Sequence, residues 1–337
     1  MELIIQENIS LKPFHSFAME VNARYFTRLS SMDQLPQIFG WKKSSSMVLG
    51  GGSNLLFTKN YDGLIIKNEM KGIHLIREDD HHVYVRAGAG EGWHSLVLHC
   101  INNGWAGMEN LSLIPGTVGA APIQNIGAYG VELKDIFFGL EAYHIKEEKL
   151  HQFSLNDCAF GYRDSIFKRS LKGELVITQV IFRLNKIPEY KITYGAIEQE
   201  LEKMNIKELS IQAISQAVCR IRSSKLPDPA VMGNAGSFFK NPAVPENKYS
   251  ELKEKFPGLV GYHQMDGSYK LAAGWLIEYC GWKGYRRDDA GCHALQSLVL
   301  VNYGHATGAE IFKLSEDIQR SVFEKFEVRL ETEVNII

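Results

Sequence analysis

The sequence predicts an α+β protein, and three patterns support that prediction. Strand-like segments dominate the first third of the chain, and no helical periodicity interrupts the stretch between Val48 and Arg86. Two long β-rich runs follow, at residues 135–154 and 174–184. Beyond Lys225, helical and strand patterns are mixed. Strands in succession without a helix between them argue against the βαβ unit of a Rossmann fold.

The bulk composition excludes several functional classes. A chain of 337 residues is long enough for two or three domains with real hydrophobic cores. Its net charge of −2 offers no basic excess for nucleic acid and no polybasic block for a membrane surface. No signal peptide pattern and no membrane-spanning apolar run are visible. Five cysteines without a C-x-x-C pair favour free thiols, so we expect a cytoplasmic protein.

The N-terminal elements can be placed by their periodicity. Strands are expected at residues 64–67, 73–76 and 82–86, where apolar and polar residues alternate or β-branched residues cluster. One helix is expected from Glu91 to Asn103, because its apolar residues repeat at helical spacing until Gly104. Residues 135–154 read as a hairpin that turns near Glu147 and Glu148.

The C-terminal elements follow a proline-containing segment. Residues 207–224 show a helical pattern that Pro227 and Pro229 end, and residues 225–229 are the expected domain boundary. Further expected elements are a helix at 270–280, a buried strand at 297–302, a helix from Thr307 to Phe326 with a capping box, and a closing strand at 328–337.

A neutral, glycine-rich stretch covers residues 111–131. It contains four glycines, two prolines and no charged side chain. Small residues let the backbone approach a flat ligand, and glycines permit turns that direct several N–H groups to one point. We interpret the stretch as a ligand cradle that offers main-chain hydrogen bonds. Composition alone leaves a long surface loop as the alternative.

A second glycine-rich stretch, residues 50–54, follows the apolar pair Met47-Val48. A strand that ends in a triple-glycine turn can present amides to a phosphate. It is not a P-loop, because no Lys-Ser or Lys-Thr follows, and it is not a dinucleotide fingerprint, because Leu55 occupies the last glycine position. Together, both stretches suggest a cofactor with a pyrophosphate and a planar ring.

Two further motifs have structural alternatives. Ser237 follows a glycine, but Phe239 replaces the second glycine of a hydrolase elbow and no histidine lies nearby. A turn serine that caps backbone groups remains the alternative. For Arg163, the alternative is a salt-bridged residue of a turn. Cys292-His293 lacks metal-ligand spacing, so no metal site is expected.

Motifs along nearly the whole chain closely resemble the UDP-N-acetylenolpyruvoylglucosamine reductase family: LGGGSNLLF, SLIPGTVGAAPIQNIGAYG, FGYRDSIFK, KLPDP, GNAGSFFKNP, KLAAGWLIE, LVLVN and LETEV. The resemblance implies a two-subdomain FAD-binding fold of the vanillyl-alcohol-oxidase/PCMH type plus a separate α+β substrate-binding domain. Residues 1–72 and 73–225 would be the FAD-binding subdomains, and residues 226–326 the substrate domain. The closing strand, 327–337, would return to the second subdomain. Residues 192–195 resemble the tyrosine-bearing loop of the type I form.

The resemblance also implies a reaction in peptidoglycan precursor synthesis. NADPH reduces the flavin and leaves, and the enolpyruvyl ether of UDP-N-acetylglucosamine then binds in its place. Hydride passes from flavin N5 to C3, and the carbanion at C2 is stabilised as an enolate before protonation to UDP-N-acetylmuramate. By resemblance, Ser237 donates the proton, and Arg163 with Glu333 stabilises the enolate. A fixed guanidinium favours the transition state because charge accumulates there. Glu333 fits beside an anionic substrate if it is protonated.

The resemblance extends to binding residues. FAD would be held non-covalently by residues of both glycine-rich stretches and by Arg222: Gly50, Gly51, Gly52, Ser53, Asn54, Leu55, Ile114, Pro115, Gly116, Thr117, Gly119, Ala120, Gln124, Asn125, Gly127, Ala128, Tyr129 and Arg222. Substrate would meet Tyr194, Lys225, Asn241, Lys270 and Gln296. One departure is Asn335, where related sequences often carry arginine, so a charge contribution from this position is in doubt.

Two other functions are compatible with parts of this pattern. A sugar or lactone oxidase could share the FAD fold, but such enzymes lack the GNAGSFFKNP and YRDS elements. A nucleotide-sugar binding protein without catalysis is the second, and the joint presence of Arg163, Ser237 and Glu333 argues against it. We expect a monomer that binds NADPH and the enolpyruvyl sugar nucleotide, with no nucleic acid partner and no membrane insertion.

Overall fold

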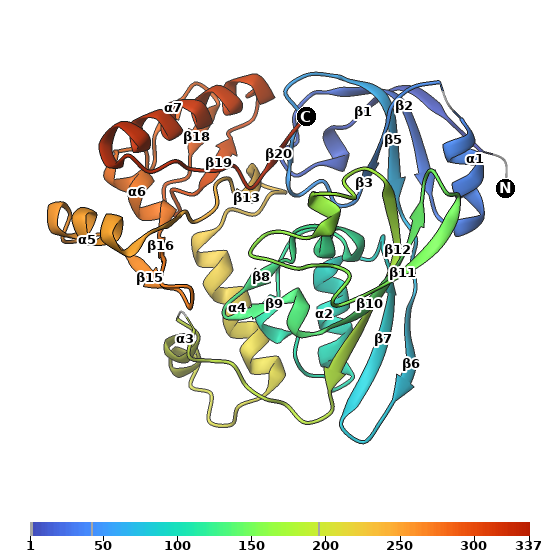
Figure 1. The fold of residues 1–337 in the computed structure, drawn as a ribbon, viewed down its shortest axis with the longest axis horizontal. Helices are drawn as coiled ribbons and strands as arrows, with labels where there is room; N and C mark the ends of the chain where they lie inside the picture. The colour runs from blue at the N-terminus through green and yellow to red at the C-terminus, as the bar shows by residue number, and fades with distance from the viewer. Residues whose placement is uncertain (1–2, 42, 195) are drawn as a thin grey trace. The chain divides into compact units, whose positions relative to one another are not determined.

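The chain forms two compact units in the computed structural model, which describes residues 3–41, 43–194 and 196–337. Unit 1 comprises Met1–Ile9, Ala23–Gly52 and Asp62–Ser224 (Figure 1). Unit 2 comprises Ser10–Asn22, Ser53–Tyr61 and Lys225–Ile337. The break at Lys225 coincides with the proline-containing boundary expected from the sequence. Two N-terminal segments join unit 2, which no local pattern indicates.

The smaller sheet of unit 1 has the strand order β1-β2-β5-β3. Its strands are β1 (Gln6–Ser10), β2 (Asn22–Leu29), β5 (Tyr61–Asn68) and β3 (Ser46–Leu49), and η1 (Lys12–Phe14), η2 (Met32–Gln34) and α1 (Leu35–Gly40) lie in the connections. β3 pairs with β5 in parallel, and Leu49 stands opposite Lys67. This pairing sets the position from which the triple-glycine turn leaves β3.

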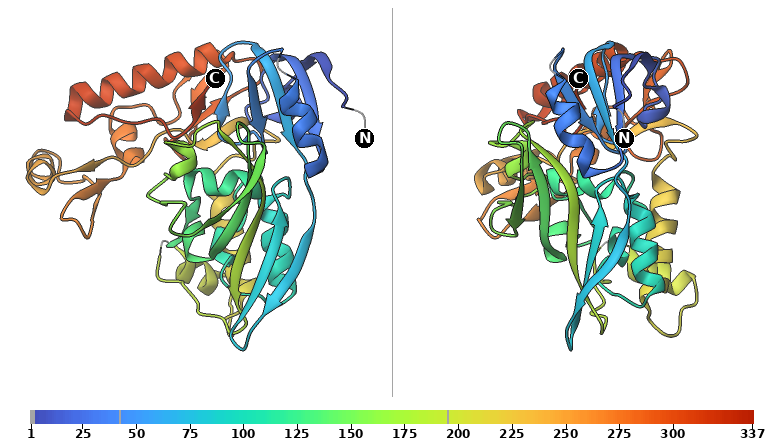
Figure 2. Two further views of the ribbon diagram at one scale, coloured as in Figure 1. Left: turned by 45° about the vertical axis from the view of Figure 1, so that its right-hand side comes forward. Right: turned by 90° about the vertical axis from the view of Figure 1, so that its right-hand side faces the viewer.

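The larger sheet of unit 1 has the order β11-β10-β12-β7-β6, and its pairs are antiparallel (Figure 2). Its strands are β6 (Ile73–Glu78), β7 (His82–Gly88), β10 (Phe137–His144), β11 (Lys149–Ser154) and β12 (Leu175–Asn185). They confirm the predicted strands and the hairpin. Helix α2 (Trp93–Asn102) packs on the sheet through Trp93, whose ring meets Phe182 edge-on at 5.8 Å. Gln212 of α4 (Ile211–Lys225) donates to the Ile101 carbonyl at 3.2 Å, so α4 lies beside α2.

The glycine-rich stretch 111–131 folds into short elements instead of a loose loop. They are η3 (Glu109–Leu111), η4 (Val118–Gln124), β8 (Gly127–Ala128) and β9 (Val131–Glu132), followed by η5 (Leu133–Asp135). The remaining elements of unit 1 are η6 (Ile166–Lys168) and α3 (Ile197–Lys203). Val118, Ala121 and Val131 are buried in the same core as α2 and the sheet. The apolar side chains of the stretch therefore anchor it in the core of unit 1, whereas its glycines are not fully buried.

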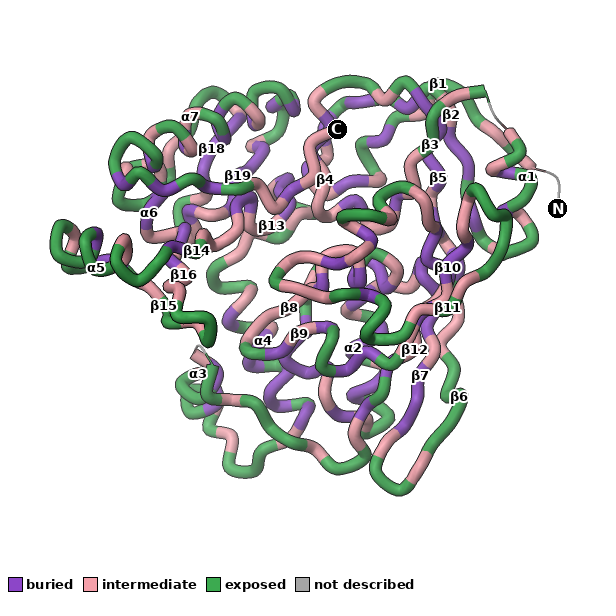
Figure 3. Tube along the Cα trace, in the orientation of Figure 1, coloured by how far each residue is buried: buried purple, intermediate pink, exposed green. Residues whose placement is uncertain are grey.

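Unit 2 has a four-stranded sheet in the order β13-β19-β18-β17 and a three-stranded sheet in the order β14-β16-β15. The strands are β13 (Gly233–Ser237), β14 (Ala243–Val244), β15 (Gly261–His263), β16 (Tyr269–Leu271), β17 (Arg286–Arg287), β18 (Ala290–Cys292) and β19 (Val299–Asn302). The helices are α5 (Glu246–Lys255), α6 (Ala273–Tyr279) and α7 (Gly308–Phe326). Buried side chains from these elements form one core that includes Phe238, Leu276 and Ile318. Figure 3 colours the buried parts of the chain purple.

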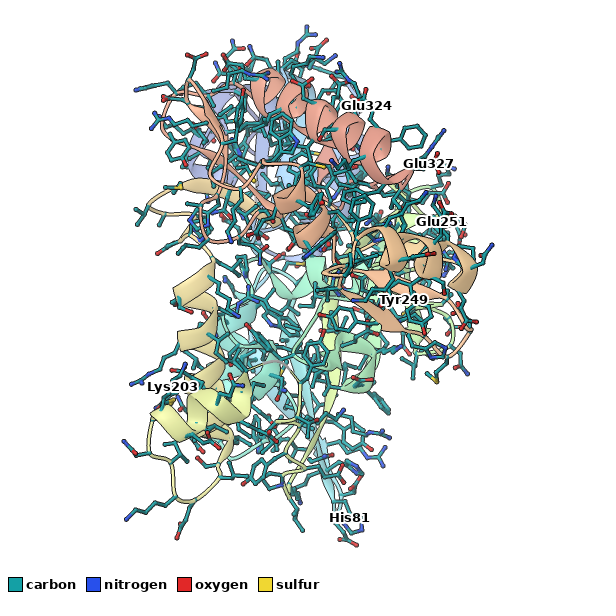
Figure 4. All side chains as sticks on the ribbon, turned by 90° about the vertical axis from the view of Figure 1, so that its left-hand side faces the viewer. His81, Lys203, Tyr249, Glu251, Glu324 and Glu327 are labelled. Carbon is teal, nitrogen blue, oxygen red and sulfur yellow. The ribbon has the colours of Figure 1, made fainter. Side chains whose placement is uncertain are left out.

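Specific contacts fix the helices of unit 2. Thr307 and Glu310 form the predicted capping box of α7. A Cβ at Gly308 would lie only 1.8 Å from the Phe57 carbonyl oxygen, so only glycine fits where α7 meets that segment. Tyr249 of α5 stacks on Tyr269 of β16 with ring centroids 4.0 Å apart (Figure 4). The N-terminal segments are therefore integral to unit 2.

Several predicted elements were wrong in extent. Lys270 lies in β16, and the helix expected from it begins at Ala273. The helix expected from residue 207 begins at Ile211. The closing strand is reduced to β20 (Asn335–Ile336), which pairs in parallel with β4 (Leu55–Leu56) inside unit 2 and does not return to residues 73–225. Across the described residues, no helix is long and apolar enough to cross a membrane.

Candidate active site

The two glycine-rich stretches meet in unit 1 through their backbones. A Cβ on Gly51 would lie 2.7 Å from the Gly116 Cα, and one on Gly50 would lie 2.5 Å from Thr117 Oγ1. Neither position can carry a side chain unless the neighbour moves, because real Cβ atoms do not approach other heavy atoms so closely. We call residues 50–52 and 114–120 the cradle. This close backbone contact is why position 51 must be glycine. A valine side chain there would clash with Gly116.

The second half of the cradle is held in place by the segment before α2. Trp93 donates its backbone N–H to the Gly116 carbonyl at 3.0 Å, and Val118 donates its backbone N–H to the Glu91 carbonyl at 2.9 Å. Gly119 donates to the Ala89 carbonyl at 2.9 Å, and a Cβ there would lie 2.5 Å from that of Ala89. Gly119 is therefore required for packing. A Cβ on Gly50 would also lie 3.5 Å from the methyl group of Ala120.

Two polar groups of the cradle lack a protein partner. The buried Thr117 hydroxyl makes no hydrogen bond within the described part of the chain. Nor does the Gly51 N–H find a protein acceptor there. An unsatisfied buried polar group costs about 1–3 kcal/mol, and a ligand with oxygen acceptors removes that cost. These orphan donors fit a phosphate-bearing cofactor such as FAD.

Asn125 serves the fold more than a ligand. It is fully buried, with a left-handed φ of 44°. Its side-chain nitrogen donates to Glu132 at 3.1 Å and to the Gly161 carbonyl at 3.0 Å, while its oxygen accepts from the Lys134 N–H. The side chain thus ties the cradle stretch to the turn that carries Arg163. Gln124, the other amide predicted as a ligand contact, is the last residue of η4.

Arg163 lies against the glycine-rich stretch. Its Nη2 donates to the Gly127 carbonyl at 2.7 Å, and a Cβ on Gly127 would lie 3.2 Å from Nη1. Its backbone has a left-handed φ of 53°, inside a tight turn that Gly161 and Asp164 close. The turn anticipated as the alternative interpretation is therefore present. Asp164 pairs with Arg169 at 3.2 Å, and the Arg163 guanidinium contacts Gly127.

A second guanidinium stands near the first. Arg222 Nε donates to the Leu113 carbonyl at 3.2 Å. Burial lowers the pKa of Arg222, and the positive charge of Arg163 acts in the same direction, although Tyr129 opposes it. Within the described residues, no carboxylate lies in ion-pair distance of Arg222. Arg163 and Arg222 thus place two positive charges near each other, and no carboxylate of the described residues pairs with Arg222. This arrangement favours an anionic ligand.

Tyr194 lies at the end of an exposed segment of unit 1. Its side chain contacts Gly130, where a Cβ would lie 3.2 Å from the Tyr194 Cβ, and 59% of the residue is exposed. Buried Asn110 donates to the carbonyls of Tyr129 at 2.9 Å and Lys191 at 2.7 Å. This amide joins the Tyr194 segment to the glycine-rich stretch. Gly195, the last residue of the loop expected at 192–195, lies outside the described residues.

Unit 2 brings Ser237 and Glu333 together. Phe239 pairs with Thr332 in an antiparallel bridge, and Glu333 donates its N–H to the Phe238 carbonyl at 2.8 Å. Residues 237–240 and 331–333 therefore run as neighbouring extended segments. The buried rings of Phe238 and Phe239 anchor the first of them in the core. Neither side of this pairing could be found from local sequence patterns.

Gly236 sets the direction in which Ser237 leaves β13. It has a left-handed φ of 69°, and the register between β13 and β19 shifts between Asn234 and Ser237. Asn234 fixes this bulge: its side chain donates to the Pro227 carbonyl at 3.1 Å and accepts from the Gly236 N–H at 2.9 Å. Bulges of this kind redirect a side chain at the end of a strand. The GNAGS motif is therefore built to position Ser237.

The C-terminal segment also binds the end of the triple-glycine turn. Asn54 donates its side-chain N–H to the Glu333 carbonyl at 3.2 Å. Asn335 donates both its backbone and its side-chain N–H to the Asn54 carbonyl, each at 3.1 Å. At position 335 this chain thus uses a neutral amide to hold the segment that contains Asn54. Asn54 and Asn335 link the segment after the triple-glycine turn to the C-terminal segment inside unit 2, and the ligand contact expected of Asn54 stays a prediction.

The candidate substrate residues are spread over several elements. Asn241 accepts from the Ala273 N–H at 3.0 Å at the start of α6. Gln296 accepts from the Leu298 N–H at 3.3 Å, and Lys270 stands in β16 opposite Ala243. Lys225 is the exposed last residue of α4. These four belong to unit 2, whereas Tyr194 belongs to unit 1.

Three buried cysteines and a lysine outside the predicted site complete the description of the reactive side chains. Burial raises the pKa of Cys100, Cys158 and Cys292 to about 12, so these thiols stay protonated. In the described part of the chain, no cluster of three or more histidine, cysteine or acidic residues could hold a metal ion. Sequence reasoning missed Lys67, whose ammonium donates to the Gly50 carbonyl at 2.5 Å. Its one sequence signal is a lysine at the end of an otherwise apolar strand.

Comparisons with known proteins define the class and then the family. A family model of the FAD-binding domain matches residues 27–152, and a model of the UDP-N-acetylenolpyruvoylglucosamine reductase C-terminal domain matches residues 228–337. The first model places the chain among FAD-binding proteins. UDP-N-acetylenolpyruvoylglucosamine reductase of Amoebophilus asiaticus is 52% identical over 99% of both chains, and that of Pseudomonas syringae pv. tomato is 50% identical over 100% of both. The chain belongs to the UDP-N-acetylenolpyruvoylglucosamine reductase family.

The fold agrees with this assignment. The crystal structure of UDP-N-acetylenolpyruvylglucosamine reductase from Thermus caldophilus matches with a TM-score of 0.70 at 23% identity, covering 99% of each chain. The likeness of fold therefore extends over the full length. The resemblance drawn from the motifs and the expected α+β FAD-binding fold with a second domain are confirmed.

Proposed function

We propose that the protein reduces the enolpyruvyl ether of UDP-N-acetylglucosamine to UDP-N-acetylmuramate, with NADPH as reductant and non-covalently bound FAD as cofactor. Family membership supports the substrate and the reaction class. The observation that carries the proposal is the hydrogen bond from Glu333 to the Phe238 carbonyl, which sets Ser237 and Glu333 on neighbouring segments. A proton donor and a carboxyl group at one place suit an addition across a carbon–carbon double bond.

The cradle would hold the cofactor. Gly51 and Thr117 offer donors that have no protein acceptor in the described residues, and diphosphate oxygens are acceptors of the right kind. Arg222 and Tyr129 lie at the glycine-rich stretch 111–131, outside the cradle. Burial raises the pKa of Tyr129, so Tyr129 stays a neutral hydrogen-bond donor. When bound, FAD supplies the hydride that is added to C3 of the enolpyruvyl group.

Arg163 would stabilise the charge that develops on the substrate carboxylate. Addition of hydride at C3 leaves an electron pair at C2, and that pair delocalises into the adjacent carboxylate as an enolate. A guanidinium held by the Gly127 carbonyl is already oriented, so it needs no reorganisation when charge accumulates. The stronger interaction in the transition state accelerates the reaction.

Ser237 would complete the addition by donating its hydroxyl proton to C2. The C2 carbanion is a strong base, so position matters more than the acidity of the donor. Position is what the bulge at Gly236 and the buried rings of Phe238 and Phe239 provide. The alkoxide left on Ser237 then recovers a proton from solvent. Glu333, in protonated form, would stabilise the enolate as a hydrogen-bond donor.

The remaining candidates would bind the nucleotide part of the substrate. Tyr194 and Lys225 are exposed and can reach a diphosphate by closing over it. Asn241, Lys270 and Gln296 are weaker candidates on the substrate side of unit 2. The flavin subdomains at 1–72 and 73–225 and a substrate domain at 226–326 remain the proposed division of labour. A cytoplasmic monomer without nucleic acid or membrane partners completes the proposal.

Product analysis tests this function. Purified protein, NADPH and the enolpyruvyl sugar nucleotide are incubated without oxygen, and the nucleotide product is identified by mass spectrometry. The expected product is heavier than the substrate by two hydrogen atoms, with one NADPH oxidised for each molecule formed. NADPH oxidation that requires oxygen and leaves the sugar nucleotide unchanged would support an oxidase instead.

A further inference from the structure

Lys67 occupies a position that the reaction itself does not use. It lies near the end of β5, opposite Leu49 in the parallel ladder with β3. Its ammonium is half-buried and donates to the Gly50 carbonyl at 2.5 Å, where the chain leaves β3 and enters the cradle. The triple-glycine turn thus follows β3, and the cation that hydrogen-bonds to its first residue belongs to the neighbouring strand β5.

The charge of Lys67 is not neutralised by a carboxylate. Its charged neighbours are Glu69, Lys71 and Arg28. Glu69 pairs with Arg28, and Lys71 pairs with Glu91 at 3.4 Å. Within the described residues, Lys67 itself forms no ion pair. Burial lowers the pKa of Lys67, and the two cations act in the same direction, whereas Glu69 opposes them. An anion near the cradle would relieve this imbalance.

The hydrogen bond also determines where the next amide points. The Gly50 carbonyl and the Gly51 N–H belong to one planar peptide group, and in a trans peptide they point in opposite directions. An ammonium that holds the carbonyl on one side therefore directs the Gly51 N–H to the other side. That N–H has no acceptor in the described part of the protein. Withdrawal of electron density through the carbonyl also strengthens the N–H as a donor.

We propose that Lys67 is a positioning residue for the cofactor diphosphate: it orients and polarises the Gly50–Gly51 peptide so that the Gly51 N–H binds a phosphate oxygen. This inference rests on the proposed FAD function and adds a residue that does not touch the cofactor. Loss of one charge-assisted interaction should raise the dissociation constant of FAD about 10- to 100-fold.

Two measurements on Lys67→Met test the proposal. Titration of FAD into apoprotein, followed by flavin fluorescence, gives the dissociation constant. Phosphorus NMR at saturating FAD reports on the diphosphate itself. We expect weaker FAD binding and shifted diphosphate resonances, with the visible flavin spectrum unchanged. Lys67→Arg, which keeps a cation at the carbonyl, should recover most of the affinity, and this pair of variants decides the matter even if the methionine variant folds poorly.

The matched control is Lys253→Met. Lys253 makes the same type of bond in unit 2, from its ammonium to the Leu259 carbonyl at 2.8 Å. It should leave FAD affinity and the phosphorus resonances as in the wild type. Wild-type affinity in Lys67→Met, or weaker binding with unmoved phosphorus resonances, would overturn the role of Lys67. Wild-type protein that fails to bind FAD would instead overturn the proposed function.

Discussion

Glu333 donates its backbone N–H to the carbonyl of Phe238 at 2.8 Å, across 95 residues of sequence. The bond joins the C-terminal segment to the residue that follows Ser237. The positions of the Ser237 hydroxyl and the Glu333 carboxyl group therefore depend on the same backbone pairing. Lys240 extends this pairing by donating its N–H to the Glu331 carbonyl. A change in this pairing should therefore affect the chemistry of Ser237 before it affects cofactor binding in unit 1.

Ser237→Ala should separate the two half-reactions. Reduction of the bound flavin by NADPH needs no proton at carbon, so its rate should stay near that of the wild type. Reoxidation by the enolpyruvyl sugar nucleotide requires the C2 proton and should slow by about 10²–10⁴-fold. Anaerobic stopped-flow absorbance measures each step. Ser237→Cys should recover part of the rate, because a thiol can donate from nearly the same place.

Two outcomes would contradict the role of Ser237. Equal slowing of both half-reactions would mean that the substitution disturbs the site in general. Normal reoxidation in the alanine variant would mean that the proton comes from another group, such as a water molecule held by Glu333.

Gly236→Ala should impair the position of Ser237 through the backbone. A left-handed φ of 69° costs a residue with a Cβ about 1–2 kcal/mol, although no atom lies within 4 Å of the added methyl group. The variant should lose stability and slow reoxidation by the sugar nucleotide. Gly281→Ala is the control, because Gly281 has a φ of 83° and equally open surroundings at the end of α6.

Thermal melts and stopped-flow traces of both glycine variants make the comparison. Both should melt at lower temperature than the wild type, and only Gly236→Ala should slow the second half-reaction. If the two variants behave alike in kinetics, the bulge at Gly236 does not position the proton donor.

Thr117→Val tests whether the cradle is built for a ligand. The buried hydroxyl has no partner in the described protein, so valine should leave the apoprotein at least as stable in urea. FAD affinity should fall, because the ligand loses a hydrogen bond of about 0.5–1.5 kcal/mol. Thr178→Val is the control in the same unit, since the Thr178 hydroxyl donates to the Glu141 carbonyl at 3.0 Å. It should destabilise the apoprotein and leave FAD affinity unchanged. The reverse pattern would place the FAD contacts elsewhere.

His15 should make the stability of the protein depend on pH. It is buried, contacts Phe57 edge-on at 5.3 Å, and burial lowers its pKa below the ordinary value of 6.5 despite a contact with the Met19 carbonyl. As pH falls below about 6.5, the unfolded chain takes up a proton that the folded chain does not, so the free energy of unfolding decreases. This loss continues until the pH reaches the lowered folded-state pKa.

Urea melts between pH 5 and pH 8 check this expectation. His15→Gln should show a flatter pH profile than the wild type, although His94 and His293, whose pKa values burial also lowers, keep some slope. His81→Gln, at an exposed turn between β6 and β7, should change nothing (Figure 4). An unchanged slope in His15→Gln would show that its burial has no energetic consequence.

Local sequence patterns predicted the elements whose burial follows a simple period. Strand β12 and helices α2 and α7 were predicted because each has buried apolar residues at the spacing of its element. Helix α5 was missed because Leu252 is its one fully buried side chain, so it has no apolar stripe. Residues 328–334 alternate because Val328, Leu330 and Val334 are buried, but most of that segment has no ladder partner and is not a strand.

The site was predicted as a set of residues and not as an arrangement. Glycine density marked the cradle, but the contact of Gly51 with Gly116 joins residues 65 positions apart. The bonds between Asn54, Glu333 and Asn335 join opposite ends of the chain. Long-range pairings of this kind depend on the whole fold, so the bonds of Asn54 to the C-terminal segment could not be predicted and Lys67 could be overlooked.

The most direct test of the account is a two-step anaerobic absorbance experiment on the purified protein. NADPH is added first, and the flavin absorbance near 450 nm should bleach, as expected for roughly complete flavin reduction by a hydride donor. The enolpyruvyl ether of UDP-N-acetylglucosamine is added second, and the yellow colour should return in the absence of oxygen. A colourless protein, or a bleached flavin that regains its colour only when air is admitted, would contradict the proposed reductase.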